Sequence, residues 1–411
     1  MNNKNFRRLS LILLILPLSL ISWAQNWPNW RGPNGDGTST ETNLPTRWDS
    51  ETNVIWKSPV PGTGHSSPVV WEDKLFTITA VQDTRERVLL CYNSKNGELL
   101  WQKTVLKADF KRKHQDNSYA SGTPATDGKH IYVSFLDDDD VLVAAYDFNG
   151  NQVWLQKPGT FYSPHGFSCS PALFEDKVII NGNSKGDGSF LAALSKKDGK
   201  LIWKVVHDNP AHSFCTPIFR EMAGKMQMIF GGDKKIISYN PDDGSQYWFV
   251  NGPSEDFCSS PVYSKKHDMV LMSSAWPQRF LVAVKPDGNG DVTESHVVWN
   301  TKKGAVYVPS PLCADDYVFT TMTNGTVHCI DIKTGETLWE ESLGKQYSSP
   351  VLADDLVYMP NDEGVITIIK PGPVFEVVAK NSIGERMNAS PAISNGKIYL
   401  RGENHIFCIG E

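Results

Sequence analysis

The eleven residues CIDIKTGETLW, from Cys329 to Trp339, recur along the chain in more or less degenerate copies. Each copy has a small residue, a polar turn and a glycine, followed four residues later by a tryptophan. The other copies end at Trp101, Trp154, Trp203, Trp248 and, after an insertion, Trp299. The pattern predicts a β-hairpin whose turn needs glycine for a positive φ. A unit this small cannot bury its own apolar face, so we expect the copies to stack.

A Ser-Pro or Thr-Pro pair precedes each unit and fixes the number of repeats. The prolines of these pairs are Pro68, Pro124, Pro171, Pro217, Pro261, Pro311, Pro350 and Pro391. The successive spacings run from 39 to 56 residues, as expected for four-stranded propeller blades. After each proline the sequence predicts an apolar strand, a turn, a second strand and then the hairpin. The sequence therefore predicts an all-β, eight-bladed propeller.

The two ends of the repeat region complement each other. The eighth unit stops at Glu411, without room for its last strand, while Asn53–Val60 supplies a strand that carries Trp56. We expect this N-terminal strand to complete the last blade and to close the ring, which leaves few sheet edges exposed. The expected docking tryptophans are Trp56, Trp101, Trp154, Trp203, Trp248, Trp299 and Trp339.

The hairpin pattern resembles the tryptophan-docking motif of the pyrroloquinoline-quinone-type (PQQ-like) β-propeller repeats. CIDIKTGETLW is a full match, and the resemblance covers residues 53–411. The resemblance implies an eight-bladed ring and two classes of function. Some members are quinone-dependent alcohol or sugar dehydrogenases, and others, such as the propeller lipoprotein of the outer-membrane barrel-assembly machinery, are scaffolds without a cofactor. Fold alone does not decide between these classes.

The N-terminus predicts export from the cytoplasm. Lys4, Arg7 and Arg8 precede an apolar run, Leu9–Ile21, and the pattern favours a signal peptide of residues 1–24. No cysteine at the expected cleavage site offers a lipid anchor, and no apolar run is long enough for a transmembrane helix. We therefore expect a periplasmic or secreted protein, and a monomer.

Loss of the signal peptide removes three cations and moves the formal charge from −6 to −9. An acidic chain without a basic block argues against a nucleic-acid partner. Residues 25–52 lie outside the repeats but contain Trp27, Trp30 and Trp48, so we expect an extension that packs on the ring. Of the seven cysteines, Cys91, Cys329 and Cys408 take small buried slots of the repeat, and a pairing of Cys215 with Cys258 stays open.

The best candidate site lies in the loops that lead into the innermost strands, because these loops meet at one mouth of a propeller channel. Their aromatic, histidine and charged residues are His65, Tyr119, His165, Phe167, His212, Phe214, Asp256, Tyr307, Lys345, Tyr347 and Arg386. Such groups suit a protein partner or a small anionic or sugar-like ligand, although a solvated mouth that caps strand ends explains them as well. No histidine or carboxylate spacing predicts a metal site or a catalytic pair.

Other polar segments have simpler interpretations. The basic loop Lys107–Asn117 is expected to be solvated and mobile, with a wall of the mouth as the alternative. The acidic run Asp137–Asp140 is expected to be a solvated turn rather than a Ca²⁺ site, and the glycine-rich loop Asn181–Phe190 gives little support for phosphate binding.

The sequence leaves two main classes of function open, and a third that it supports less. The sequence favours a non-catalytic binding or scaffold module without a cofactor. The alternative is an alcohol or sugar dehydrogenase that needs PQQ and Ca²⁺. Against it stand short loops between blades and the lack of adjacent cysteines and of a cluster of Ca²⁺ ligands. A carbohydrate-binding or carbohydrate-active propeller is the weaker alternative.

Overall fold

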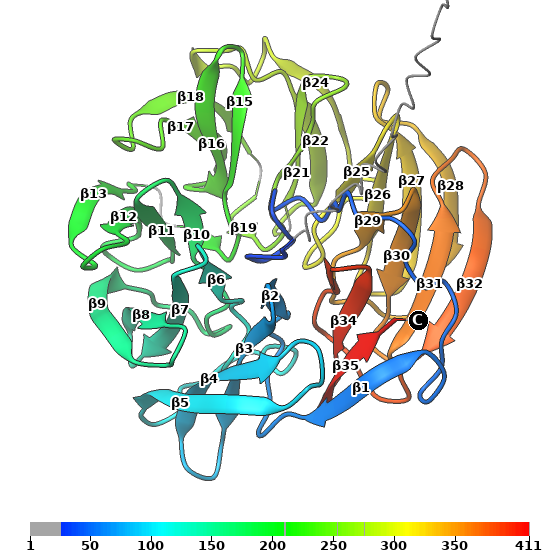
Figure 1. Ribbon diagram of the computed structural model, residues 1–411. Coiled ribbons are helices and arrows are strands. Elements are labelled where there is room, and N and C mark those ends of the chain that lie inside the picture. The colour runs from blue at the N-terminus through cyan, green and yellow to red at the C-terminus, as the bar shows by residue number, and fades with distance from the viewer. Residues whose placement is uncertain (1–25, 209–210, 253, 275, 411) are drawn as a thin grey trace, which may run out of the picture.

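The computed structural model describes residues 26–208, 211–252, 254–274 and 276–410. The predicted signal peptide, residues 1–24, lies outside them. Among these residues the elements are strands and no helix occurs, so no helix is present that could cross a membrane. Eight of the nine sheets stand radially around a central channel, which confirms the predicted eight-bladed propeller (Figure 1).

The first four blades follow one another along the chain, each as an antiparallel meander from the channel outward. Blade 1 consists of β2 (Val69–Trp71), β3 (Lys74–Val81), β4 (Glu86–Asn93) and β5 (Leu99–Lys107). Blade 2 consists of β6 (Ala125–Thr126), β7 (His130–Asp137), β8 (Asp140–Asp147) and β9 (Gln152–Thr160). Blade 3 consists of β10 (Ala172–Phe174), β11 (Lys177–Gly182), β12 (Phe190–Ser195) and β13 (Leu201–Val206). Blade 4 consists of β15 (Ile218–Met222), β16 (Lys225–Gly232), β17 (Lys235–Tyr239) and β18 (Gln246–Asn251).

The remaining blades repeat this plan. Blade 5 consists of β20 (Val262–Ser264), β21 (Met269–Ser274), β22 (Phe280–Val284) and β24 (Val297–Thr301). Blade 6 consists of β25 (Leu312–Ala314), β26 (Tyr317–Thr321), β27 (Thr326–Asp331) and β28 (Thr337–Ser342). Blade 7 consists of β29 (Val351–Ala353), β30 (Leu356–Pro360), β31 (Val365–Lys370) and β32 (Glu376–Ser382). Blade 8 consists of β33 (Ala392–Ser394), β34 (Lys397–Arg401), β35 (His405–Ile409) and the N-terminal strand β1 (Val54–Pro59).

The antiparallel pairing of β1 with β35 confirms the predicted ring closure, with Trp56 opposite Cys408. A buried arginine reinforces the same seam between blades 8 and 1. Nη1 of Arg401 on β34 donates to the carbonyl oxygens of Ser66 and Ile78 and to Oγ1 of Thr77, all in blade 1. Burial lowers the pKa of Arg401 to about 10. The first and last strands of the chain therefore depend on each other.

Each docking tryptophan forms a hydrogen bond to the next blade. The indole Nε1 atoms of Trp56, Trp101, Trp154, Trp203, Trp248, Trp299 and Trp339 donate to backbone carbonyls in the hairpin turn of the following blade, at 2.9–3.1 Å. In the register of the sheet, a small residue of the neighbouring strand stands opposite each ring, such as Cys91 opposite Trp101. The turn position requires glycine for two reasons. At Gly97 the φ angle is positive, 74°, and a Cβ would lie only 2.6 Å from the Trp56 ring.

Blade 7 is the exception, because Ala379 occupies the tryptophan position opposite Ile368. Trp48 of the N-terminal extension, residues 26–52, belongs to the same apolar cluster as Ala379. The backbone N–H of Trp48 donates to the side chain of Asn381 on β32. The extension therefore supplies apolar surface where the repeat lacks its tryptophan.

Candidate binding mouth

The Ser/Thr-Pro pairs form a hydrogen-bonded collar around the channel. In seven of the eight seams, the backbone N–H of the Ser or Thr donates to the side-chain hydroxyl of its counterpart in the next blade, at 2.8–3.0 Å. Since each hydroxyl oxygen accepts from a neighbouring blade, its O–H can donate toward the channel. The repeat landmark of the sequence is thus the element that fixes the loops of the mouth in place.

A cavity of about 290 Å³ lies at the mouth side of the collar. Its size falls near the lower end of the range of about 300–1,000 Å³ that is typical of small-molecule sites. Of the predicted mouth residues, the structure brings together His65, His165, Phe214, Tyr307 and Tyr347 in its wall. His212 and Asp256 line an adjoining recess, which shares His165 and Tyr307 with the cavity.

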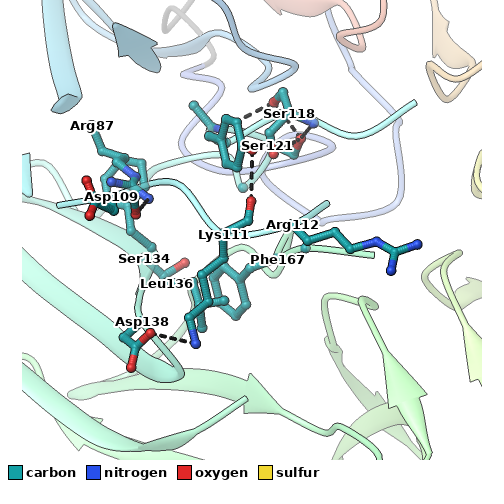
Figure 2. A pocket seen from close by; sticks show the side chains of 15 residues that line it. Arg87, Asp109, Lys111, Arg112, Ser118, Ser121, Ser134, Leu136, Asp138 and Phe167 are labelled. Atoms are coloured by element: carbon teal, nitrogen blue, oxygen red, sulfur yellow. Dashed lines mark hydrogen bonds and ion pairs between the residues drawn. The ribbon is translucent and has the colours of Figure 1, made fainter. Parts of the chain in front are cut away.

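The other predicted residues lie elsewhere. Tyr119 and Phe167 line a separate cavity of about 30 Å³ at the seam of blades 1 and 2, with room for about one water (Figure 2). The exposed Arg386 faces Asp362, with Nη2 3.6 Å from Oδ2. Lys345 is exposed and lines neither the cavity nor the recess.

The loop Lys107–Asn117 forms one wall of the mouth and is held there by hydrogen bonds, whereas the sequence favoured a mobile loop. His114, Asp116 and Asn117 line the cavity. The side chain of Asn117 and the backbone N–H of His114 both donate to the carbonyl of His165, at 2.7 and 3.2 Å. At the start of the loop, the guanidinium of Arg87 lies over the ring of Phe110, 4.2 Å from its centroid.

The acidic run Asp137–Asp140 is neutralised by lysines. Lys111 pairs with Asp138 (Figure 2) and with Asp139, and Lys157 pairs with Asp137 and Asp140, at distances from 2.5 to 3.0 Å. These contacts tie the turn of blade 2 to the loop that forms the wall of the mouth. The carboxylates therefore act as an anchor for that loop.

The N-terminal extension crosses the ring at the other end of the channel, where the dark blue segment passes the centre in Figure 1. Trp27 pairs with Val70 of blade 1, and Asp36 forms an ion pair with Arg220 of blade 4. The buried Arg31 donates to the carbonyl of Pro311 beside blade 6. Trp30 lines the mouth cavity, so the extension provides its floor.

Two histidines of the mouth, His65 and His165, are shifted toward the neutral form. Burial lowers the pKa of His65 to about 4, and Arg401 and Lys113 act in the same direction. Burial also lowers the pKa of His165, assisted by His212. The rings of His165 and His212 lie edge to face, with centroids 5.5 Å apart. Near neutral pH the imidazoles of His65 and His165 offer both a hydrogen-bond donor and an acceptor.

All seven cysteines lie in the described part of the chain and are free thiols, so Cys215 and Cys258 form no disulfide. Cys91, Cys329 and Cys408 fill the small buried slots that the repeats predict. Cys258 lines the cavity, and burial raises the pKa of its thiol, which disfavours the reactive thiolate.

Sequence reasoning missed several residues of the mouth. Trp30 comes from the extension, and Asn388 accompanies His65, with Nδ2 3.1 Å from its Nε2. Trp276 lies outside the repeat motif, and an aromatic residue left over after the repeats are aligned is a signal that could have identified it. Tyr162, between β9 and β10, and Lys185, between β11 and β12, were not among the predicted residues.

The residues that line the cavity can be compared with what PQQ needs from its binding site. PQQ is a planar tricarboxylate, and it needs cationic partners and a set of oxygen ligands for Ca²⁺. Among the described residues that line the cavity, none is Lys or Arg, and Asp116 is the single carboxylate. No group of three or more His, Cys, Asp or Glu side chains in the described ranges is placed to hold a metal ion. The wall of the cavity therefore does not fit PQQ with Ca²⁺.

The fold and the docking contacts define the class as an eight-bladed PQQ-like repeat propeller. The sequence profile of the family described as outer membrane protein assembly factor BamB matches residues 84–257 and 277–371, which is more than half of the chain. The chain belongs to this family.

Three individual proteins show the range of its relatives. The outer membrane protein assembly factor BamB of Yersinia pestis is 23% identical over 305 residues, which cover 69% of this chain and 72% of that protein. The tetrathionate hydrolase of Acidithiobacillus ferrooxidans is 22% identical over 433 residues, which cover 95% of this chain and 72% of that protein.

Among solved structures, the quinohemoprotein alcohol dehydrogenase of Comamonas testosteroni superposes with a TM-score of 0.65 at 12% identity. The superposition covers 94% of this chain and 81% of that chain, and at this identity the likeness concerns the fold alone. Proteins that resemble this chain in sequence or in fold therefore include an assembly factor, a hydrolase and a dehydrogenase.

Proposed function

We propose that this protein is a periplasmic or secreted, non-catalytic binding or scaffold module that engages its ligand or partner through the mouth of the propeller channel. The observation that carries the proposal is the cavity of about 290 Å³ at the mouth. Loops of several blades build its wall, and Trp30 of the N-terminal extension forms its floor. A concave site with aromatic and polar walls is the usual form of a binding site.

The chemistry of the wall supports binding over the dehydrogenase alternative. Three imidazoles, two tyrosines and a ring of Ser and Thr hydroxyls line the cavity, together with Phe214 and Trp30. The pKa of His65 is about 4, so this side chain stays neutral near pH 7 and makes a poor proton donor there. The membership of the BamB family supports a scaffold role, and export from the cytoplasm follows from the predicted signal peptide.

The test replaces two accessible residues of the wall together with Arg386, which is exposed and lies outside the cavity. His165, Tyr347 and Arg386 are each changed to Ala in one protein, since none of them is fully buried and the cost to folding is small. His212 is left intact because it is buried against Asp256. We expect a partner or ligand captured by the wild type from an extracytoplasmic extract to be lost, with an unchanged melting curve.

A matched control changes three accessible residues away from the mouth, namely Val206, Lys333 and Val374, to Ala. This variant is expected to capture the same material as the wild type. If the mouth variant retains the partner and the control variant loses it, the binding face lies on the outer strands or the docking turns, and the proposal is wrong.

A further inference from the structure

A recess of about 570 Å³ adjoins the mouth cavity beside blades 3, 4 and 5. It shares His165 and Tyr307 with the cavity, so a ligand can occupy both at once. The other side chains of its wall are Tyr162, Pro164, Lys185, His212, Asp256 and Trp276.

Two aromatic side chains of the recess are unusually exposed. Trp276 is 58% exposed and Tyr162 is 62% exposed. Large aromatic rings left in water at the edge of a concavity mark surfaces that a ligand covers, because their burial contributes about 25 cal/mol per Å². Each ring also has a polar group, so it suits a ligand that is only partly apolar.

One ring nitrogen of a buried histidine in the recess lacks a hydrogen-bond partner among the described residues. His212 and Asp256 stand side by side on the short parallel strands β14 (His212–Ser213) and β19 (Asp256–Phe257). Nδ1 of His212 lies 3.2 Å from Oδ1 of Asp256, and both residues are at least 95% buried. Nε2 of His212, on the other side of the ring, has no partner in the described chain. An unsatisfied buried polar atom costs about 1–3 kcal/mol, so a ligand hydroxyl at this atom is favoured.

The charges around the recess are balanced. Lys185 lies 3.0 Å from Glu255 and 3.9 Å from Asp256, and Lys234 lies 3.4 Å from Glu255. Two ammonium groups thus face two carboxylates. An anionic ligand would compete with these carboxylates, and a cationic ligand would compete with the lysines. A neutral ligand whose groups both donate and accept hydrogen bonds avoids both costs.

We propose that the recess is a subsite for a neutral saccharide, with the C–H faces of its sugar rings against Trp276 and Tyr162. A pyranose ring has apolar C–H faces and a rim of hydroxyl groups, which matches exposed aromatic rings beside His212 and Lys185. Several linked sugar rings extend from the recess into the cavity past His165. This inference rests on the proposed function and specifies the ligand of the same mouth.

The experiment is isothermal titration of the full-length protein with maltohexaose, cellohexaose, xylohexaose and tetra-N-acetylchitotetraose, with choline as a cationic probe. We expect at least one oligosaccharide to bind with a Kd below 1 mM and choline not to bind. Trp276→Ala and Tyr162→Ala should each weaken binding at least tenfold, while Trp276→Tyr should keep most of it. Both side chains are exposed, so the melting temperature should stay within about 1 °C of the wild type.

Val374→Ala is the matched control, because Val374 is an exposed residue in a turn at the opposite face of the ring. Failure of all four oligosaccharides to bind, preferential binding of choline, or binding that survives Trp276→Ala and Tyr162→Ala would overturn the inference. If no saccharide binds but the mouth variant still loses a protein partner, the saccharide is wrong and the proposed function stands. If a saccharide binds and only substitutions outside the mouth abolish its binding, both the saccharide subsite and the proposed function are wrong.

Discussion

Trp248→Ala tests the energetic role of the docking tryptophans most cleanly. Trp248 is fully buried, and its Nε1 donates to the carbonyl of Pro286 at 3.1 Å and to Oε1 of Gln227 at 2.8 Å. Its removal leaves both acceptors satisfied, because Gln227 also donates to Pro286 and accepts from Ser238. The cost therefore comes from lost burial and from the cavity left behind, about 3–5 kcal/mol.

The assay is thermal and urea unfolding of the wild type, Trp248→Ala and Trp276→Ala. With an unfolding entropy of about 2.1 cal/mol/K per residue, a loss of about 4 kcal/mol lowers the melting temperature of a protein of this length by about 5 °C. Trp276→Ala should lower the free energy of unfolding by less than about 0.5 kcal/mol, because its side chain is mostly exposed. Equal losses at the two sites would refute the docking argument.

Two further predictions concern ring closure and pH. A protein that begins at Ser66 lacks Asn53–Val60 and exposes the edge of β35 beside Cys408. Light scattering should show that it aggregates at concentrations where the wild type is monomeric. A stable monomer would contradict closure of the ring by β1. The pKa of His65 is 6.5 in the unfolded chain and about 4 in the folded protein, so stability should fall as pH drops from about 6.5 to 4, by about 3 kcal/mol from this group. His65→Gln should flatten that part of the pH profile, and an unchanged slope would remove His65 as its source.

The repeat pattern allowed the fold to be predicted because each of its features has a local physical cause. The turn glycine needs a positive φ, and the small residue stands opposite the tryptophan in register. Strand β1 could be paired with blade 8 because the last repeat lacked one strand. These features depend on residues within one hairpin or on a simple count of strands.

The pattern did not rank the tryptophans by burial. Trp339, in the full match to the motif, is only partly buried, whereas Trp248 in a degenerate copy is fully buried. The difference comes from the insertion in blade 5. Its strand β23 (Gly290–Asp291) pairs with β18 and covers the outer edge of blade 4. A long-range contact of this kind leaves no trace in the repeat spacing.

The mouth was predictable in outline and not in detail. Position before the innermost strand identified His65, His165 and Tyr307, because the ring brings equivalent positions together. The same rule was wrong for Tyr119 and Phe167, whose side chains turn into the seam of blades 1 and 2. The direction of a side chain in an irregular loop depends on neighbours such as Lys111. Trp30 reaches the cavity because of the path of the N-terminal extension, and the repeats do not encode this path.

The most direct test of the account is to place a photo-crosslinker at one position at a time. We would substitute p-benzoylphenylalanine for Tyr347 in the mouth, for Val206 on the outer strand β13 and for Val374 in the turn before β32. Irradiation in native extract should give adducts from the Tyr347 position and none from the other two. Adducts from Val206 or Val374, with none from Tyr347, would contradict binding through the mouth.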